Sequence, residues 1–292
     1  MKTPIKYAAM TSGRSGAGLN QIATIVHPEI ELARFSKMPN ISQLDGFAGL
    51  FLHGISKVPK NLRRRAIIFG MTSFAKFASK NSTFRQDMEK HPVQEIWVNN
   101  YTSSVILNRL GLKCKTMYRP SPRLVIPATC PKISKKRVIL LYWREGDKIL
   151  TRHTPSLIRL VRTLKDFEFW AFPGTEKFCN AKNLRMLGKA QPNKVIPSAT
   201  GMIRLSCLFD LGRSTFDMLG YGRWCLYCKT FDNFIFDVHS FSKLPQQVRE
   251  IVEADTQEAV RRRWTYARNN FSRQAIHHRW VAAFKEITAR MH

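Results

Sequence analysis

The sequence predicts an α/β protein with two doubly wound domains, and two observations carry this prediction. Short apolar segments alternate with helix-like segments along the chain, and several are followed by Gly, Ser or Asn, a pattern typical of parallel sheets covered by helices. A basic, proline-punctuated stretch interrupts this series, after which the alternation begins again. At 292 residues the chain is long enough for two modest domains. Because doubly wound folds bind ligands at the carboxyl ends of their strands, we expect the two domains to face a cleft.

Six short apolar segments make up the expected strands of the first half. They lie at residues 5–10, 30–35, 49–53, 66–70, 95–98 and 115–118. A helix is expected at residues 102–110, with Thr102 or Ser103 as its N-cap and Gly111 as its stop. These elements form an expected N-terminal domain of residues 1–131.

The second series of elements follows a basic linker that contains four prolines between residues 119 and 132. Strands are expected at 138–143, 167–172, 195–196 and 224–228, and helices at 155–164 and 213–219. A long helical stretch from 244 to 291, with a break near 269–271, completes the chain. The expected C-terminal domain spans residues 132–270.

The bulk composition limits the class of protein. No run of about 18 apolar residues exists, which argues against a membrane span, and the opening residues lack the apolar core of a signal peptide. We therefore expect a cytoplasmic protein. The six cysteines are scattered and do not suggest a disulfide framework. The one close pair, Cys225 and Cys228, fits a metal or redox site less well than a buried strand, because no second pair follows.

The formal net charge of +28 is the unusual bulk property. Such an excess repels itself, and an anionic partner would relieve it. Nucleic acid, an anionic membrane surface and an acidic glycan are all compatible with this charge, which alone does not choose between them.

The segment from Arg204 to Trp224 offers the clearest candidate binding site. A polar loop leads into the expected helix at 213–219, whose free backbone N–H groups favour a phosphate. Asp217 lies one turn into that helix, where a carboxylate can accept both hydroxyls of a ribose. Gly220 and Gly222 allow a tight turn into the next strand. The alternative is a capped helix with a solvated Asp217.

This segment resembles the donor-site signature of GT-B-fold glycosyltransferases, in which an acidic residue precedes a turn of the form x-Met-Ala-x-Gly-x-Pro. Residues 217–224, Asp-Met-Leu-Gly-Tyr-Gly-Arg-Trp, match that turn, with Asp217 in place of the usual Glu. The resemblance implies that Asp217 holds the nucleotide ribose and that Asp210 lies near the transferred sugar. It also implies that the diphosphate meets the helix start, at Gly212, Arg213, Ser214 and Thr215.

Three further features agree with the resemblance. Arg144 and Lys148 follow the strand at 138–143, where basic residues of the family neutralise the leaving diphosphate. Gly13 and Gly16 lie in a Gly-rich turn after the first strand, like the turn that faces the cleft in many members. The last segment, 271–292, fits the helix that crosses back onto the N-terminal domain. The family likeness thus implies a metal-independent hexosyl- or pentosyl-transferase with a nucleotide-sugar as co-substrate and no permanently bound cofactor.

The catalytic base is less clear from the sequence. His53 ends an apolar strand, so it would point into a cleft, and its near-neutral pKa in water suits removal of a proton from an acceptor hydroxyl. A structural histidine bonded to backbone is the alternative. Asp45 is a rival base, although Asp-Gly at 45–46 is typical of a turn. Asn99 and Asn100, after the strand at 95–98, are candidates to bind acceptor or sugar.

Basic residues suggest the nature of the acceptor. Arg63, Arg64 and Arg65 follow soon after His53, and further arginines alternate with aromatic residues in the last helices, which suits a phosphate backbone and unstacked bases. One hypothesis is a glycosyltransferase that acts on a hydroxymethylated base flipped out of DNA. A second is a glycosyltransferase of surface or envelope glycans that docks on an anionic membrane. A third is a nucleic-acid-binding α/β protein without enzymatic activity.

Overall fold

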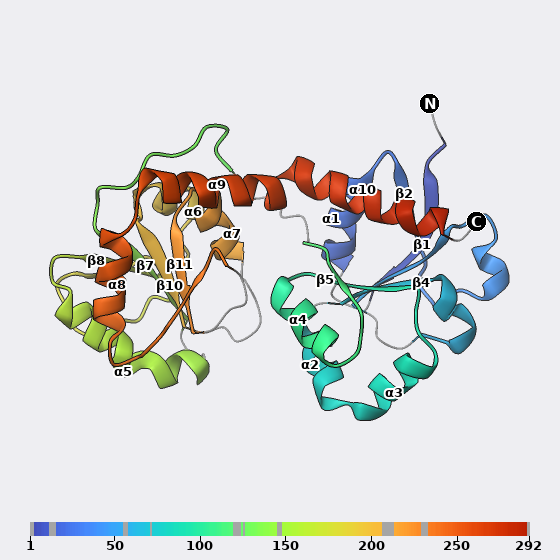
Figure 1. Ribbon diagram of the computed structural model, residues 1–292, viewed down its shortest axis with the longest axis horizontal. Coiled ribbons are helices and arrows are strands. Elements are labelled where there is room, and N and C mark those ends of the chain that lie inside the picture. Colours follow the sequence, from blue (N-terminus) through green and yellow to red (C-terminus); the bar gives the residue numbers. More distant parts are fainter. Residues whose placement is uncertain are drawn as a thin grey trace. The chain divides into compact units, whose positions relative to one another are not determined.

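The computed structural model describes residues 3–11, 16–54, 58–70, 72–118, 124, 126–144, 148–205, 213–228 and 233–290. The chain divides into two compact units (Figure 1). The N-terminal unit comprises Met1–Pro122 together with Arg273–His292, and the C-terminal unit comprises Arg123–Ser272. The boundaries expected from the sequence are 131/132 and 270/271, whereas these units divide at 122/123 and 272/273.

The N-terminal unit contains a six-stranded parallel sheet. Its strands are β1 (Ile5–Thr11), β2 (Ile30–Arg34), β3 (Gly49–His53), β4 (Ala66–Gly70), β5 (Glu95–Val98) and β6 (Lys115–Thr116). The order across the sheet is β2-β1-β3-β4-β5-β6, so the direction of winding reverses between β1 and β3. Every residue of β3 and β4 is buried, as continuous apolar strands of a parallel sheet require.

Helices cover both faces of this sheet. One face packs against α1 (Gly16–Val26) and α10 (Arg273–Ala289), which share a core cluster with it. The other face packs against a set of short helices: η2 (Ile41–Leu44), η3 (Lys60–Arg65), α2 (Thr72–Lys80), α3 (Ser82–Lys90) and α4 (Tyr101–Arg109). The predicted α/β class is confirmed for this unit.

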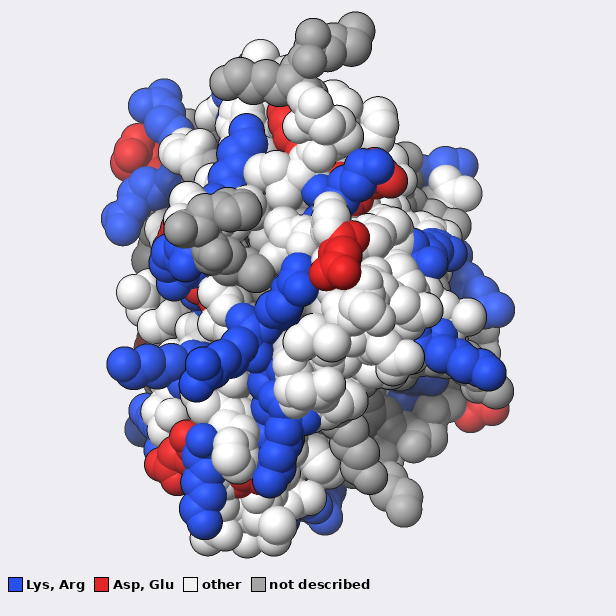
Figure 2. Space-filling model, turned by 90° about the vertical axis from the view of Figure 1, so that its right-hand side faces the viewer, with Lys and Arg blue, Asp and Glu red and all other residues white. Residues whose placement is uncertain are grey.

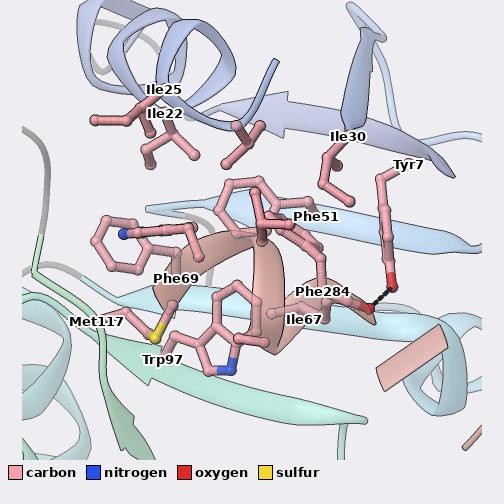
Figure 3. Packing of buried hydrophobic residues seen from close by; sticks show 14 of the residues in the cluster. Tyr7, Ile22, Ile25, Ile30, Phe51, Ile67, Phe69, Trp97, Met117 and Phe284 are labelled. Atoms are coloured by element: carbon pink, nitrogen blue, oxygen red, sulfur yellow. Dashed lines mark hydrogen bonds between the residues drawn. The ribbon is translucent and has the colours of Figure 1, made fainter. Parts of the chain in front are cut away.

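The last helix contributes large aromatic side chains to the first core (Figure 3). The Trp280 ring lies edge-on to that of Trp97, with centroids 5.4 Å apart, and 5.2 Å from the ring of Phe69. Its indole N–H donates to the carbonyl oxygen of Tyr118 at 2.9 Å. Phe284 packs against the ring of Tyr7 at 4.7 Å. Residues from the end of the chain therefore complete the core that the first 118 residues begin.

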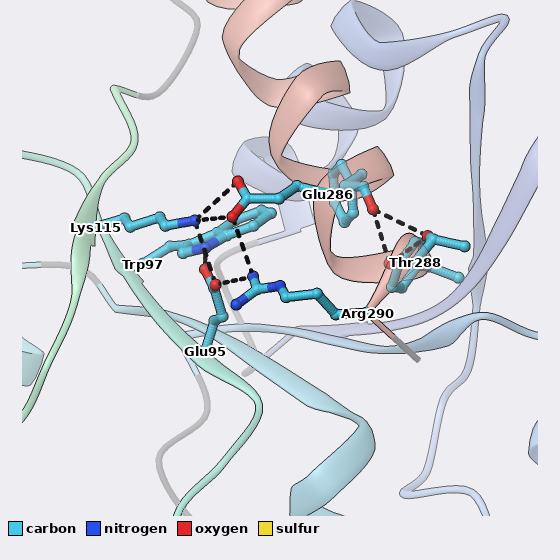
Figure 4. Close-up of polar contacts among 8 residues, drawn as sticks. Glu95, Trp97, Lys115, Glu286, Thr288 and Arg290 are labelled. Atoms are coloured by element: carbon cyan, nitrogen blue, oxygen red, sulfur yellow. Dashed lines mark hydrogen bonds and ion pairs between the residues drawn. The ribbon is translucent and has the colours of Figure 1, made fainter. Parts of the chain in front are cut away.

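An ion-pair network fastens the end of α10 to the sheet (Figure 4). Glu95, at the start of β5, accepts a hydrogen bond from the Trp97 indole at 2.6 Å and pairs with Arg290. Lys115 lies 3.3 Å from Glu95 and 3.1 Å from Glu286 of α10. Burial alone would raise the pKa of Glu95, but the hydrogen bonds from Trp97 and Arg290 and the charge of Lys115 outweigh it, so its pKa lies below the ordinary value.

The C-terminal unit contains a second parallel sheet with six strands. They are β7 (Val138–Trp143), β8 (Glu168–Pro173), β9 (Leu184–Met186), β10 (Gly201–Arg204), β11 (Trp224–Tyr227) and β12 (Phe236–Asp237). The order is β12-β11-β10-β7-β8-β9, so the winding reverses between β7 and β10. The helical elements are α5 (Lys148–Thr163), α6 (Pro192–Val195), η4 (Ile196–Ser198), α7 (Arg213–Gly220), α8 (Leu244–Glu253) and α9 (Gln257–Phe271).

Two of the differences from the expected elements of this unit have a clear physical cause. The strand expected at 195–196 is wrong: Val195 ends α6, which starts at a proline, and Ile196 begins η4. The central strand β10 is absent from the expected elements, because it begins with Gly201 and contains only two apolar residues. The ring of Trp224 occupies the place of a side chain at Gly201, where a Cβ would lie 2.0 Å from it.

The buried strand expected around Cys225 is present. Cys225 lies in a buried strand, and both it and Cys228 are free thiols. The residues that the structure describes include no group of three metal-ligating side chains. No helix in the described ranges is long and apolar enough to cross a membrane.

We predict that Glu95→Gln destabilises the protein at neutral pH by about 1–3 kcal/mol, because it removes the charge of a mostly buried carboxylate that pairs with Lys115 and Arg290. Since the folded-state pKa of Glu95 is lowered, its contribution is present above about pH 4.3 and is lost as the pH falls through the folded-state pKa. Urea denaturation of both proteins across pH 3–7 measures the difference. The control is Glu31→Gln, which breaks the exposed pair with Lys6. An equal loss in both variants, or a loss independent of pH, would contradict the prediction.

Candidate functional site

The carboxyl edge of the C-terminal sheet carries a cation at the point where the winding reverses. Arg204 ends β10, and Tyr142 lies near the end of the adjacent strand β7. The guanidinium carbon of Arg204 lies 4.2 Å from the centroid of the Tyr142 ring. Its Nη1 is 3.4 Å from the hydroxyl oxygen of Ser214, in the first turn of α7. Open α/β sheets bind their ligands at such a reversal point, so this edge is the best candidate site of the unit.

Helix α7 is fixed firmly at this edge. The hydroxyl of Thr215 is buried and hydrogen-bonded to the hydroxyl of Tyr227, at the end of β11. Gly222, just beyond the helix, has a φ of +68°, and a Cβ there would lie 2.7 Å from the carbonyl oxygen of Val260. The carbonyl oxygen of Gly222 accepts a hydrogen bond from Arg263 of α9 at 2.8 Å. The start of α7, including Ser214, is therefore held beside Arg204 before any ligand arrives.

Asp217 is buried in α7, with only 4% of its surface exposed. The alternative of a solvated capped-helix aspartate is therefore not what the structure shows. A buried carboxylate is costly unless polar groups or positive charge compensate it. Its place one turn beyond Ser214 is compatible with the predicted role as a ribose ligand, which stays a prediction.

The other expected donor-side residues are placed only in part. Arg144 follows β7 directly and is exposed, so it also lies at the carboxyl edge of the sheet. Lys148 and Arg213 are the first residues of α5 and α7, and the structure does not describe their side chains. Asp210 and Gly212 lie outside the described residues.

The N-terminal sheet has an equivalent reversal point, between β1 and β3. Thr11 ends β1 and His53 ends β3, and the Thr11 hydroxyl oxygen lies 3.4 Å from Nδ1 of His53. The His53 ring is buried and lies 5.4 Å from that of Phe69. Gly16 is the first residue of α1, the helix that follows β1, and Gly13 lies outside the described residues. His53 therefore occupies the expected end of its strand.

The rival base Asp45 lies at the opposite edge of the sheet. It follows η2 and precedes β3, and Gly46 beside it has a φ of +80°. The turn expected at Asp-Gly 45–46 is therefore present. A side chain before the start of β3 is separated from His53 by the length of that strand, so Asp45 does not join the His53 site.

Asn99 and Asn100, which follow β5, form hydrogen bonds within their own unit. Asn100 is buried and N-caps α4, accepting the N–H of Ser103 at 2.7 Å. Its Nδ2 donates to the side-chain oxygen of Asn99, which is half-buried. Asn100 is thus the helix N-cap, in place of the expected Thr102 or Ser103. An acceptor-binding role for the two asparagines stays a prediction.

The three arginines of η3 lie before β4, at the amino edge of the sheet, and not beside His53. Arg63 is buried, and its guanidinium pairs with Asp87 and donates to the carbonyl oxygen of His91 at 2.9 Å. Arg65 donates to the carbonyl oxygen of Phe47 at 2.6 Å. Arg64 is exposed. An acceptor-binding role for these arginines stays a prediction. Two of them, Arg63 and Arg65, form hydrogen bonds within their own unit.

Comparisons with known proteins establish the fold alone. No protein-family model and no curated protein sequence matches the chain. Among solved structures, Anabaena HepE in complex with UDP-glucose gives a TM-score of 0.59 at 10% identity, covering 96% of this chain and 99% of that one. The glycosyltransferase of kitacinnamycin gives 0.53 at 11% identity, with full coverage of both chains.

Longer proteins also match. The GtfA/B complex gives a TM-score of 0.58 at 12% identity, and Staphylococcus aureus TarM, in complex with UDP, gives 0.53 at 12%. The chain covers 57% of the length of each, little more than half. These similarities show the two-sheet α/β fold of GT-B glycosyltransferases, which the sequence predicted.

Proposed function

We propose that this protein is a glycosyltransferase that takes a sugar from a nucleotide-sugar and transfers it to an acceptor hydroxyl. The observation that carries the proposal is the carboxyl edge of the C-terminal sheet, where Arg204 and the start of α7 meet at the reversal of winding. Two proteins of the same fold, HepE and TarM, are seen in complex with UDP-glucose and with UDP.

In this proposal the donor lies along α7. Asp217 accepts the ribose hydroxyls, and the diphosphate meets the helix start at Ser214 and at the backbone N–H of Thr215, whose own hydroxyl is bonded to Tyr227. Arg144 and Lys148 add positive charge for the leaving diphosphate, and this electrostatic stabilisation replaces a metal ion. The chemistry is then metal-independent transfer of a hexose or pentose, without a permanently bound cofactor.

The proposal is tested by measuring thermal shifts of the protein against a panel of nucleotide-sugars. We expect at least one to raise the melting temperature, and Asp217→Asn to weaken that ligand about 10- to 100-fold, the value of a hydrogen bond to a charged group. The matched control is Asp166→Asn, which alters an exposed carboxylate at the amino end of β8 that pairs with Arg249. If no nucleotide-sugar binds the wild-type protein, the proposed function is wrong and a non-enzymatic binding protein is the better account.

For the acceptor side we propose that His53 takes the proton from the attacking hydroxyl. We expect His53→Ala to lower kcat about 10²- to 10⁴-fold while the affinity for the nucleotide-sugar is unchanged. Because His53 is buried, the melting temperature of each variant is measured alongside. His91→Ala, at the end of α3, is the control. A normal kcat in a folded His53→Ala protein would leave His53 a structural residue.

The acceptor, in our proposal, is itself polyanionic or sits on an anionic surface. Residues 46–86 and 96–144 contain no Asp or Glu, and Lys and Arg dominate the charged surface of the face drawn in Figure 2. The two candidates are DNA that carries a hydroxymethylated base and a surface or envelope glycan that the enzyme reaches by docking on an anionic membrane.

Binding assays with duplex DNA and with vesicles of anionic or neutral lipid separate these two candidates. We expect tight binding at low salt to one polyanion, with affinity that falls steeply as salt increases. Neutral vesicles are the control. Equal and weak binding to all three ligands would mean that the positive charge serves solubility alone.

A further inference from the structure

The segment at residues 126–137, which precedes β7, is fastened along α9 of the C-terminal unit (Figure 1). The Trp264 indole of α9 donates to the carbonyl oxygen of Pro127 at 2.9 Å. Gln257, at the start of α9, donates to the carbonyl oxygen of Pro131 at 2.9 Å. The segment therefore runs antiparallel to the helix, because its earlier residue contacts the later turn.

The end of this segment is fixed to the body of the same unit. Arg223 donates to the carbonyl oxygen of Lys132 at 3.0 Å. The hydroxyl of Thr200, just before β10, donates to the carbonyl oxygen of Lys136. These contacts use backbone oxygens of the segment, so they hold its course without engaging the lysine side chains.

Exposed cations line the fixed segment and the helix stripe that faces it. In the segment, every Lys and Arg from residue 132 to residue 137 is exposed. On α9, two exposed arginines continue the stripe that carries Gln257 and Trp264, since all four residues follow one another at spacings of three or four. We call this set of cations the linker–α9 surface: Lys132, Lys135, Lys136, Arg137, Arg261 and Arg268.

The lysines of the linker–α9 surface keep their charge uncompensated. Residues 96–144 contain no Asp or Glu. Two carboxylates contact the surface through its arginines: Asp166 pairs with Arg137, and Glu258 lies 3.5 Å from Arg261. Within the described ranges no carboxylate pairs with the three lysines. A row of fixed, unpaired cations of this kind attracts a polyanion.

The composition of the linker–α9 surface favours a duplex nucleic acid over a membrane or a single strand. Stable docking on a membrane combines positive charge with an apolar anchor, and the surface holds none. The large exposed apolar side chains of the described chain lie elsewhere: Ile41, Phe77, Tyr101 and Phe236. The nearest aromatic ring, Trp264, is half-buried beneath Arg268, 5.2 Å from its guanidinium carbon, so unstacked bases find no exposed ring. Charge alone remains, and the dense phosphates of a duplex reward it most.

The linker–α9 surface also lies apart from the proposed donor site. Lys136 and Arg137 directly precede β7, whereas the donor site lies at the carboxyl end of that strand. Six residues of extended strand separate the two edges by about 20 Å. A polyanion on the surface therefore leaves the donor edge open.

We propose that the linker–α9 surface binds the phosphate backbone of duplex nucleic acid without reading its sequence. The surface holds the protein on the polymer and takes no part in the reaction. This inference goes beyond the proposed function and does not rest on it, because the surface would serve a transferase and a non-enzymatic binding protein equally.

Fluorescence anisotropy of a short labelled DNA duplex of mixed sequence, titrated with the full chain at several salt concentrations, tests the proposal. The surface variant combines Lys132→Gln, Lys135→Gln and Lys136→Gln. We expect it to lower the affinity for the duplex about 10- to 100-fold at low salt. The slope of log K against log salt should become shallower by about 2–3, because each lost phosphate contact removes about 0.9. Arg137 is left unchanged, since it also pairs with Asp166.

The matched control variant combines Lys177→Gln, Lys189→Gln and Lys243→Gln. It removes the same charge from exposed lysines of the same unit, which follow β8, follow β9 and precede α8. We expect it to keep an affinity close to that of the wild-type protein. The melting temperature and the affinity for nucleotide-sugars are measured for both variants and should be unchanged.

Four outcomes would overturn the inference. The wild-type protein fails to bind the duplex at low salt, or the two variants lose affinity equally, so that net charge and not this surface attracts DNA. A single strand of the same length binds more tightly than the duplex, which assigns the contact to the bases. The surface variant loses binding to vesicles of anionic lipid and keeps its affinity for the duplex, which makes the surface a membrane contact. A wild-type protein that binds no nucleotide-sugar refutes the proposed function alone, because that result leaves the comparison of the two variants intact.

Discussion

Parallel strands must be covered by helices on both faces, and this constraint decides the path of the chain. In the N-terminal unit the first face of the sheet carries α1, whose apolar residues share their cluster with Trp280 and Phe284 of α10. The short helices η2 to α4 are packed on the other face. The chain therefore returns from the C-terminal unit at Arg273 to finish the first sheet. The ion pairs of Glu95 with Lys115 and Arg290 add a polar fastening at the end of the same helix.

The same strand arrangement places the chemistry. Each sheet reverses its winding beside its first strand, and each reversal brings a polar pair to the carboxyl edge: Thr11 with His53 in one unit, Arg204 with Tyr142 in the other. The neighbouring helix α7 adds Ser214 and the buried Asp217. The C-terminal edge has the features of an anion site, and the N-terminal edge offers a histidine. Donor binding at the first edge and proton transfer at the second are the proposed roles.

Much of this fold could be predicted from the sequence, because apolar strands such as β3, β4 and β7 are uninterrupted and bounded by polar residues. The strand β10 could not, since Gly201 is explained only by the Trp224 ring that fills its place, a contact between distant residues. Because β10 was not predicted, Arg204 could not be recognised as a candidate site residue at the end of a strand. Local composition likewise could not tell that Arg63 is buried against Asp87 or that Asn100 is a helix cap.

The return of α10 has a consequence for the order of events on the ribosome. The C-terminal unit is continuous in sequence, so all of its residues have been made once Ser272 has left the exit tunnel. The N-terminal unit, though synthesised first, still lacks Trp280 and Phe284 at that moment, so Phe51, Phe69 and Trp97 have not yet made their ring contacts with α10. Domains usually mature from the N-terminus onward during translation. Here the core of the first unit is complete only when α10 has been made, whereas the second unit needs no residue beyond Ser272.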